Sequence, residues 1–218
     1  MFILERPSIA IVIPAYNEHK TIGQVVKSVS NYGKVIVVDD GSTDNTFDES
    51  IKYNAIVVKH KDNLGYDEAL NSGFKMARKL KFSFVITFDA DGQHVASVLD
   101  QFIDALLYKN FDLVLGRRHK SARFSEYIYR IYSSYKFKWH DPLCGMKGYN
   151  LKIYDEIGVF DSISSIGTEL AVYGISNGYS YTELDIPILK RQDNPRFYSV
   201  FKSNVLILRA MYRIIKKY

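Results

Sequence analysis

Short runs of apolar, largely β-branched residues recur through the first half of the chain and predict buried β-strands. Polar residues scarcely interrupt them, as expected of strands that are covered on both faces of a sheet. The runs are Ile9–Ile13, Val35–Val38, Ala55–Val58 and Phe84–Phe88, and Phe111–Leu115 predicts a fifth strand.

Apolar residues at helical spacing lie between and beyond these runs. Ile22, Val25, Val26 and Val29 follow the i, i+3, i+4, i+7 pattern of one helix face, and similar spacing occurs over 70–77 and 95–106. Strands that alternate with helices predict a single α/β domain with a mostly parallel central sheet flanked by helices. Ligands of such sheets bind beyond the carboxyl ends of the strands.

Acidic and polar residues gather where the predicted strands end. The first, second and fourth strands run into 14–18, 39–44 and 89–93. Carboxylates brought together at one edge repel each other, so positive charges or hydrogen-bond donors must lie beside them. Asp89 and Asp91 are suited to bind one hard divalent cation, Mg²⁺ or Mn²⁺, and Gln93 adds an amide oxygen. Taken alone, these residues are also typical of turns and helix caps.

Several other kinds of site are not indicated. The chain has neither a P-loop nor a dinucleotide-binding glycine motif after its first strand. Its histidines lack the spacing of a zinc site. The single cysteine, Cys144, forms no internal disulfide and has no histidine partner nearby in sequence, so we do not expect it to be a nucleophile.

Four motifs follow one another along the chain: I-V-I-P-A-Y-N-E (11–18), V-V-D-D-G-S-T-D (37–44), N-L-G-Y-D-E-A-L-N-S-G-F (63–74) and F-D-A-D-G-Q-H (88–94). In this order and spacing, they resemble glycosyltransferase family 2 of the GT-A fold. The similarity continues in G-R-R (116–118), D-P-L-C-G-M-K (141–147), G-T-E-L (167–170) and E-L-D-I-P-I-L-K-R (183–191). It covers about residues 8–195, and the polyprenyl- or dolichyl-phosphate mannose or glucose synthases are the most similar subgroup.

The resemblance implies an inverting, metal-dependent enzyme that transfers a sugar from GDP-mannose or a UDP-sugar to a polyprenyl phosphate. By motif position, the implied nucleotide-sugar contacts are Pro14, Ala15, Tyr16, Glu18, Asp39, Asp40, Gly65, Asp89, Ala90 and Asp91. The implied metal ligands are Asp89, Asp91 and Gln93. The implied acceptor contacts are Arg117, Arg130 and Ser134, and Arg191 falls where an arginine contacts the donor phosphates.

The acceptor determines whether a general base is needed. A phosphate acceptor is already anionic, whereas a hydroxyl of a glycan must give its proton to a carboxylate. Asp141 and Glu169 are the candidate bases, and each is equally well explained as an ion-pair partner. Together with Asp91, Arg117 and Arg191 they form the set of candidate catalytic residues.

Two other classes of protein are compatible with parts of the chain. A catalytically silent nucleotide-sugar-binding protein would share the donor motifs, although the full Asp89, Asp91 and Gln93 set favours an enzyme. A nucleic-acid-binding module would explain the basic and aromatic stretch 123–138. The acidic strand ends would repel nucleic acid, so we expect no such partner.

The formal net charge of +5 is concentrated in two segments. Residues 117–138 hold seven Lys or Arg and one Glu, and residues 190–218 hold eight and one Asp. Together with the motifs, this charge distribution divides the single predicted domain into three parts. They are a nucleotide-sugar-binding half (1–115), an acceptor half (116–195) and a basic amphipathic C-terminal helix (196–218). Such basic segments favour an anionic partner.

The predicted C-terminal helix has two distinct faces. Its apolar face comprises Phe201, Val205, Leu208, Tyr212 and Ile215, and its basic face comprises Lys202, Arg209, Arg213 and Lys216. This pattern suits an anionic membrane surface and equally suits packing against the protein's own domain. Trp139 and the tyrosines of 127–135 offer a second surface with the same two interpretations.

The chain shows no signal-peptide pattern and no uninterrupted apolar run of membrane-spanning length. A single cysteine fits a reducing compartment. We therefore expect a cytoplasmic protein, peripheral at the cytoplasmic face of a membrane. Binding through a membrane-anchoring partner subunit is also compatible with the sequence.

Overall fold

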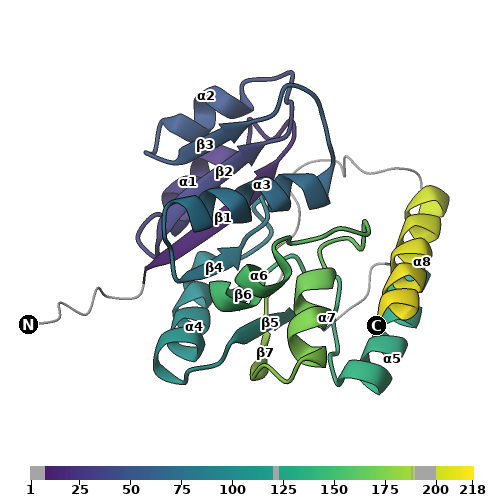
Figure 1. Ribbon diagram of the computed structural model, residues 1–218. Helices are drawn as coiled ribbons and strands as arrows, with labels where there is room; N and C mark the ends of the chain where they lie inside the picture. The colour runs from purple at the N-terminus through teal and green to yellow at the C-terminus, as the bar shows by residue number, and fades with distance from the viewer. Residues whose placement is uncertain (1–7, 120–122, 188, 190–199) are drawn as a thin grey trace, which may run out of the picture.

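A seven-stranded sheet in the order β3-β2-β1-β4-β6-β5-β7 runs through the protein in the computed structural model, which describes residues 8–119, 123–187, 189 and 200–218 (Figure 1). The strands are β1 (Ile9–Ala15), β2 (Lys34–Asp39), β3 (Ile56–Lys59), β4 (Phe84–Thr87), β5 (Leu113–Arg117), β6 (Lys147–Asn150) and β7 (Tyr181–Asp185). Only β6 is antiparallel to its neighbours, β4 and β5. The prediction of a mostly parallel sheet is confirmed.

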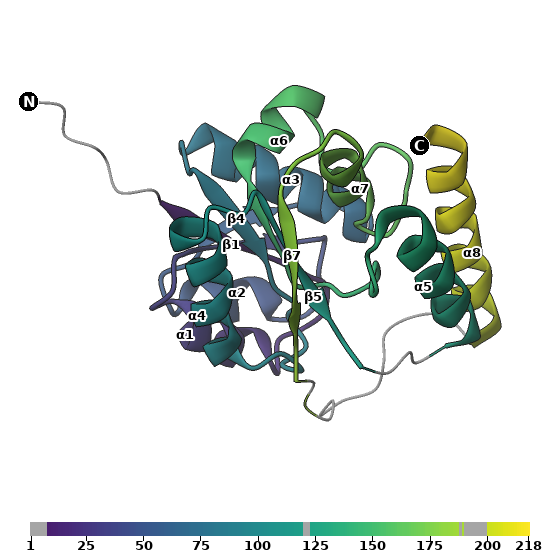
Figure 2. The same cartoon turned by 90° about the horizontal axis from the view of Figure 1, so that it is seen from below.

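Helices cover both faces of the sheet (Figure 2). They are α1 (Ile22–Val29), α2 (Thr46–Ile51), α3 (Tyr66–Lys79), α4 (Leu99–Ile103), α5 (Phe124–Phe137), α6 (Leu151–Ile157), α7 (Glu169–Ser176) and α8 (Val200–Lys217). A 3₁₀ turn, η1 (Ala96–Val98), precedes α4, and a π-helical turn, η2 (Asp104–Tyr108), follows it. Helices α1 and α4 pack on one face, and α3, α5, α6, α7 and α8 lie on the other.

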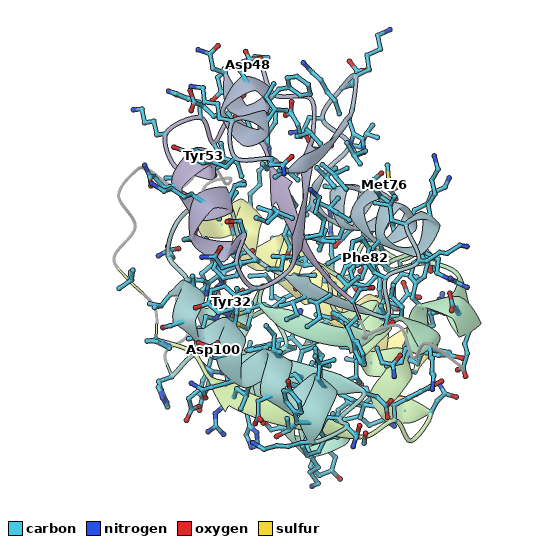
Figure 3. All side chains as sticks on the ribbon, turned by 90° about the vertical axis from the view of Figure 1, so that its left-hand side faces the viewer. Tyr32, Asp48, Tyr53, Met76, Phe82 and Asp100 are labelled. Carbon is cyan, nitrogen blue, oxygen red and sulfur yellow. The ribbon has the colours of Figure 1, made fainter. Side chains whose placement is uncertain are left out.

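The alternation of side chains along β1 divides the core into two clusters. Ile11 and Ile13 point into the cluster under α1 and α4, whereas Ala10 and Val12 point toward α3 on the opposite face. Figure 3 shows the molecule from the side of α1 and α4, where the partly buried Tyr32 packs at the border of the first cluster. Both faces of the central strands are therefore covered, as their apolar composition predicts.

The predicted fifth strand begins two residues later than expected. Phe111 donates its backbone N–H to the carbonyl of Ala105 at 3.0 Å. This bond ties Phe111 to the π-helical turn η2, so pairing with the sheet starts only at Leu113.

The C-terminal helix α8 packs beside α5, and Figures 1 and 2 both show the two helices side by side. Ile207, Ala210 and Ile214 form its buried stripe. Asn204 accepts hydrogen bonds from the backbone N–H and the hydroxyl of Ser125 at 3.1 and 2.6 Å. The expectation that the helix packs on its own domain is thus confirmed for this stripe.

A second apolar stripe of α8 stays at the surface. Most of the apolar face that the sequence predicts is exposed, namely Phe201, Leu208, Tyr212 and Ile215. On α5, Phe124, Tyr127, Ile131 and Tyr135 are exposed in the same way, whereas Tyr129 and the adjoining Trp139 are buried. No helix among the described residues is long and apolar enough to cross a membrane.

The two consecutive isoleucines near the end of α8 give a matched test of its docking. Ile214 is fully buried, whereas Ile215 is 44% exposed. Ile214→Ala should lower the free energy of unfolding by about 2–4 kcal/mol, because it removes buried methyl groups and leaves a cavity. Ile215→Ala should change it by less than about 0.5 kcal/mol. Urea denaturation of both variants checks this, and equal effects would contradict the docked orientation of α8.

Candidate functional site

The carboxyl ends of β2, β1 and β4 lie side by side at one edge of the sheet, so the loops that follow them meet there. Asn17 donates its backbone N–H to the Ser42 hydroxyl at 2.9 Å, and Glu18 donates its N–H to Thr46 Oγ1 at 2.7 Å. These bonds bind the loop after β1 to the loop after β2. The predicted gathering of 14–18, 39–44 and 89–93 at one edge is confirmed.

Asp40 joins three segments at this edge. Its Oδ1 accepts hydrogen bonds from His60 Nδ1 at 2.7 Å and from the Leu64 N–H at 2.9 Å. Its Oδ2 accepts one from the Gly65 N–H at 2.8 Å. Gly65 has a φ of +97°, a conformation that glycine adopts without the strain imposed by a Cβ atom. The glycine of the N-L-G-Y motif is therefore needed to bring this amide to Asp40.

Asp39, the last residue of β2, is fully buried. Its Oδ1 accepts a hydrogen bond from the Ser42 N–H at 3.0 Å. Among the described residues its Oδ2 has no hydrogen-bond partner. A buried acceptor without a donor costs free energy, which a ligand O–H or N–H group would offset.

The proposed metal ligands all belong to one turn after β4. Asp89 Oδ2 contacts His94 Nε2 at 2.9 Å, and Asp91 Oδ1 accepts the Gln93 N–H at 3.0 Å. Oxygen ligands from a single turn fit Mg²⁺ or Mn²⁺, which bind few protein carboxylates and complete their shell with phosphate and water. No cluster of three or more Asp, Glu, His or Cys side chains forms a metal cage within the described residues.

Gly145 supports Asp89 from the neighbouring segment. A Cβ atom on Gly145 would lie 2.3 Å from both carboxylate oxygens of Asp89. Any larger residue at this position would push the Asp89 carboxylate away from its present place. Gly145 is thus a functional residue that the sequence did not reveal, because the D-P-L-C-G-M-K motif lies far from Asp89 along the chain.

Positive charges compensate the partly buried carboxylate of Asp89, as the sequence predicted. Burial opposes its ionisation, but the hydrogen bond and charge of His94 and the charges of Arg118 and Lys147 hold the pKa of Asp89 below its ordinary value. Burial itself lowers the pKa of Lys147 to about 8. The Lys147 ammonium donates to the Gly167 carbonyl at 2.8 Å and lies 5.4 Å from the centre of the Trp139 ring.

Arg118 connects this carboxylate to α5 and to the segment around Asp141. It binds Asp141 through two hydrogen bonds of 2.8 and 2.9 Å, and its backbone N–H also donates to Asp141 at 2.9 Å. A second carboxylate, Glu126 of α5, lies 3.7 Å from its guanidinium. Burial works against the charged form, yet the bonds and charge of Asp141 raise the pKa of Arg118 above its ordinary value. The side chain is therefore a fixed, permanent cation.

An open groove of about 1040 Å³ lies along α5 and the end of β5. Its lining combines cationic and imidazole side chains with a strip of isoleucine and tyrosine side chains and one serine. The lining residues are Arg117, Arg118, His119, Arg123, Tyr127, Arg130, Ile131, Ser134, Tyr135 and His140. All three predicted acceptor contacts, Arg117, Arg130 and Ser134, are thus brought into one groove.

The arginines of the groove are held by different partners. Arg117 forms an ion pair with Asp185 of β7 at 2.6 Å. Arg130 donates from Nε to the His140 carbonyl at 2.8 Å and from its terminal nitrogen to the Arg118 carbonyl. Arg118, which no acceptor assignment from the sequence included, lines the groove as well. Strand direction alone does not show which of two adjacent arginines faces a site.

The two candidate bases are both buried in ion pairs. Asp141 is held by Arg118, and Glu169 accepts bonds from Lys217 of α8 and from the Ser162 hydroxyl at 2.9 Å. Glu169 therefore fastens α8 to the domain, which supports its interpretation as an ion-pair partner. Burial raises the pKa of Cys144 to about 12, which disfavours a reactive thiolate. Arg191 lies outside the described residues; Leu189, two positions earlier, bonds through its N–H to the Gln93 carbonyl at 2.9 Å.

Comparison with known proteins identifies the family. Residues 10–164 match the family model described as Glycosyl transferase family 2. The chain belongs to this family. The resemblance inferred from the four motifs is thereby confirmed, together with the GT-A fold.

Individual family members extend this finding. A UDP-N-acetylglucosamine–dolichyl-phosphate N-acetylglucosaminyltransferase of Methanococcus voltae is 36% identical over 53% of the chain and 53% of that protein. A polyprenol monophosphomannose synthase of Mycolicibacterium smegmatis is 26% identical over 84% of the chain and 77% of that protein. The chain spans about half the length of the first curated relatives it matches.

A solved structure shares the architecture. Glucosyl-3-phosphoglycerate synthase of Mycobacterium tuberculosis superposes with a TM-score of 0.73 at 17% identity, covering 96% of the chain and 79% of that protein. It was crystallised with Mn²⁺, UDP and glucosyl-3-phosphoglycerate. At this identity the similarity establishes the fold.

A pair of carboxylates, the partly buried Asp67 and the buried Asp161, lies behind the site. Asp67 of α3 accepts the Gly167 N–H at 2.7 Å and the Ile166 N–H at 3.3 Å. Burial and the neighbouring charge of Asp161 raise the pKa of Asp67 to about 7. Because Ile166 and Gly167 both have positive φ, these bonds hold a strained turn that also receives the Lys147 ammonium.

The raised pKa of Asp67 makes stability depend on pH. Between the ordinary value of 3.8 and about 7, the folded protein retains a proton that the unfolded chain has released. Stability from this proton is complete below about pH 4 and is lost as the pH rises through 7. As the pH rises from 5 to 8, the free energy of unfolding of Asp67→Asn should therefore increase by about 2 kcal/mol relative to that of the wild type. Urea denaturation across this pH range checks the prediction, and Asp100→Asn, at an exposed position, is the charge control. If the free energy of unfolding of Asp67→Asn and of the wild type changed in parallel with pH, the raised pKa of Asp67 would be contradicted.

Proposed function

We propose that this protein is an inverting, metal-dependent glycosyltransferase that transfers a sugar from a nucleotide-sugar donor to a polyprenyl phosphate at a membrane surface. The observation that carries the proposal is the juxtaposition of two sites. Arg118 lines the basic groove with its apolar strip, and its charge also acts on the carboxylate of Asp89. A lipid phosphate combines an anionic head with an apolar chain, and this groove offers a partner for each.

The donor would bind at the carboxyl edge of the sheet. The strand ends and loops that meet there contain Pro14, Ala15, Tyr16, Glu18, Asp39, Asp40 and Gly65. Asp89, Asp91 and Gln93 are the residues that would hold Mg²⁺ or Mn²⁺. When bound, such an ion neutralises charge on the donor diphosphate and so stabilises the leaving nucleoside diphosphate. The Asp89 ligand would be kept ionised by His94, Arg118 and Lys147.

The groove would bind and orient the acceptor phosphate. Arg117, Arg130 and Ser134 provide donors for phosphate oxygens, and Arg118 adds a fixed positive charge. An acceptor phosphate oxygen attacks the anomeric carbon, and the bond from that carbon to the donor diphosphate oxygen breaks. Attack from the opposite side inverts the configuration. The protein's contribution is to align the two anions while offsetting their repulsion.

The state of the candidate bases supports a phosphate acceptor over a hydroxyl. Asp141 is bound by Arg118, and Glu169 is fully buried against Lys217. Neither is therefore available to take a proton from a glycan hydroxyl. A phosphate acceptor requires no such transfer.

The exposed apolar residues beside the groove support contact with a membrane surface. Tyr127, Ile131 and Tyr135 both line the groove and are exposed on α5. The adjacent α8 adds an exposed apolar stripe and the cations Lys202, Arg209, Arg213 and Lys216. Aromatic and apolar side chains insert at the headgroup boundary, while Lys and Arg attract anionic lipids. This arrangement would place the mouth of the groove at the level of lipid phosphates.

The proposed reaction is tested by screening donors for release of nucleoside diphosphate. UDP- and GDP-sugars are supplied with Mg²⁺ or Mn²⁺, with and without undecaprenyl phosphate in vesicles. We expect release that depends on both metal and lipid with one donor, together with formation of a glycosylated lipid phosphate. Metal-dependent release that lipid does not stimulate would contradict the acceptor, and no release with any donor would contradict the activity.

Arg117→Ala isolates the role of the groove. Its guanidinium is a surface ion-pair partner, so the fold should tolerate its removal. We expect the KM for polyprenyl phosphate to rise about tenfold and the KM for the donor to change less than about twofold. Arg78→Ala removes a comparable exposed ion pair, with Asp155, and should leave both constants unchanged. A larger effect on the donor than on the acceptor would refute the assignment.

Membrane contact is tested with matched surface variants. Replacing Ile131 and Tyr135 of α5 by serine should weaken sedimentation with phosphatidylglycerol-containing vesicles about tenfold, because two exposed apolar groups no longer insert. The control replaces Leu80 and Tyr108, which are exposed elsewhere on the domain, by serine. Equal losses in both double variants, or no vesicle binding by the wild type, would overturn the proposed surface.

A further inference from the structure

His60 occupies one of the hydrogen-bond acceptor positions of Asp40. The carboxylate can only accept a hydrogen bond from the imidazole, so Nδ1 carries the hydrogen in the 2.7 Å contact to Asp40 Oδ1. The other ring nitrogen, Nε2, lies 2.8 Å from the Ser72 hydroxyl of α3. Because both nitrogens have partners, the ring is fixed in orientation.

The remaining acceptor capacity of Asp40 can be counted. A carboxylate offers about four lone-pair positions, two on each oxygen. His60 and the Leu64 N–H fill both positions on Oδ1, and the Gly65 N–H fills one on Oδ2. One position on Oδ2 is left for a ligand.

An unpaired acceptor lies next to Asp40 in the chain. The adjacent Asp39 is fully buried, and its Oδ2 has no hydrogen-bond partner among the described residues. The loop after β1, which carries Tyr16, is joined to the same place, since Asp40 donates its N–H to the Ala15 carbonyl at 2.8 Å. Tyr16 itself is partly exposed and presents an aromatic ring at this edge.

The single remaining acceptor position of Asp40 distinguishes guanine from uracil, the bases of the GDP- and UDP-sugars in the proposed donor screen. The pairing edge of guanine carries two neighbouring N–H donors, which a carboxylate accepts with one position on each oxygen. The pairing edge of uracil carries a single N–H between two carbonyls. With Oδ1 filled, Asp40 can accept one donor but not a neighbouring pair, and a buried donor left without a partner loses binding free energy.

We propose that His60, by filling Oδ1 of Asp40, makes the donor site select uridine over guanosine. This inference rests on the proposed function, in which Asp40 is one of the residues that bind the nucleotide-sugar, and it assigns Asp40 to the base. His60 is a positioning residue that acts through Asp40. The donor would accordingly be a UDP-sugar.

Calorimetric titration with UDP and with GDP, each with Mn²⁺, tests the selection directly. We expect the wild type to bind UDP at least about tenfold more tightly than GDP. His60→Ala frees one acceptor position on Oδ1 of Asp40. The preference for UDP over GDP should therefore decrease by about tenfold, mainly because GDP binds more tightly. His60→Asn keeps an N–H donor near Asp40 and should restore much of the preference. Ser72→Ala leaves the contact of His60 Nδ1 with Asp40 in place and should therefore retain the preference for UDP.

The outcomes separate this inference from the proposed function. Equal or tighter binding of GDP by the wild type would overturn uridine selection while leaving a nucleotide-dependent transferase intact. A parallel loss of both nucleotides in His60→Ala, with the ratio unchanged, would show that His60 only maintains the fold. Failure of both nucleotides to bind the wild type would overturn the proposed function and the selection with it.

Discussion

The compensation of crowded carboxylates is the constraint on which the rest of the site depends. Asp39, Asp40 and Asp89 lie at neighbouring strand ends, where their mutual repulsion would destabilise the fold without donors nearby. Backbone amides and histidines supply part of this compensation, and Arg118 and Lys147 supply the rest from the second half of the chain. The two halves of the domain are therefore held together by charge as well as by the continuous sheet.

This arrangement prepares the site before a ligand arrives. Arg118 is fixed by Asp141 rather than by substrate, so aligning it for an anion requires little further ordering. Lys147, buried beside Trp139, contributes charge without occupying the groove. The proposed phosphate acceptor and diphosphate donor would thus bind in an electrostatic field produced by charged groups that the fold already holds in place.

The sequence predicts the first half of the domain better than the second, for physical reasons. Strands β1 to β4 are apolar runs, and their pattern is sufficient to locate them. Strand β6 carries Lys147 and Gly148, and it is buried only because the Gly167 carbonyl and the Trp139 ring replace water around the ammonium group. The motifs point to the loops at the strand ends and to residues of the groove, but they do not show the contacts made by Gly145 and His60. Those two act through contacts with residues distant in sequence, which no local pattern shows.

The order of strands in the sheet also bears on how the chain reaches this structure. Strands β1 to β4 occupy one side of the sheet and come from one continuous stretch of the chain, so their pairing requires comparatively short loop closures. Strand β6 must then return about sixty residues later to lie between β4 and β5, and only afterwards can β7 pair with β5. We therefore expect the half that contains β1 to β4 to order first during synthesis, with the pairing of β6 as a late step.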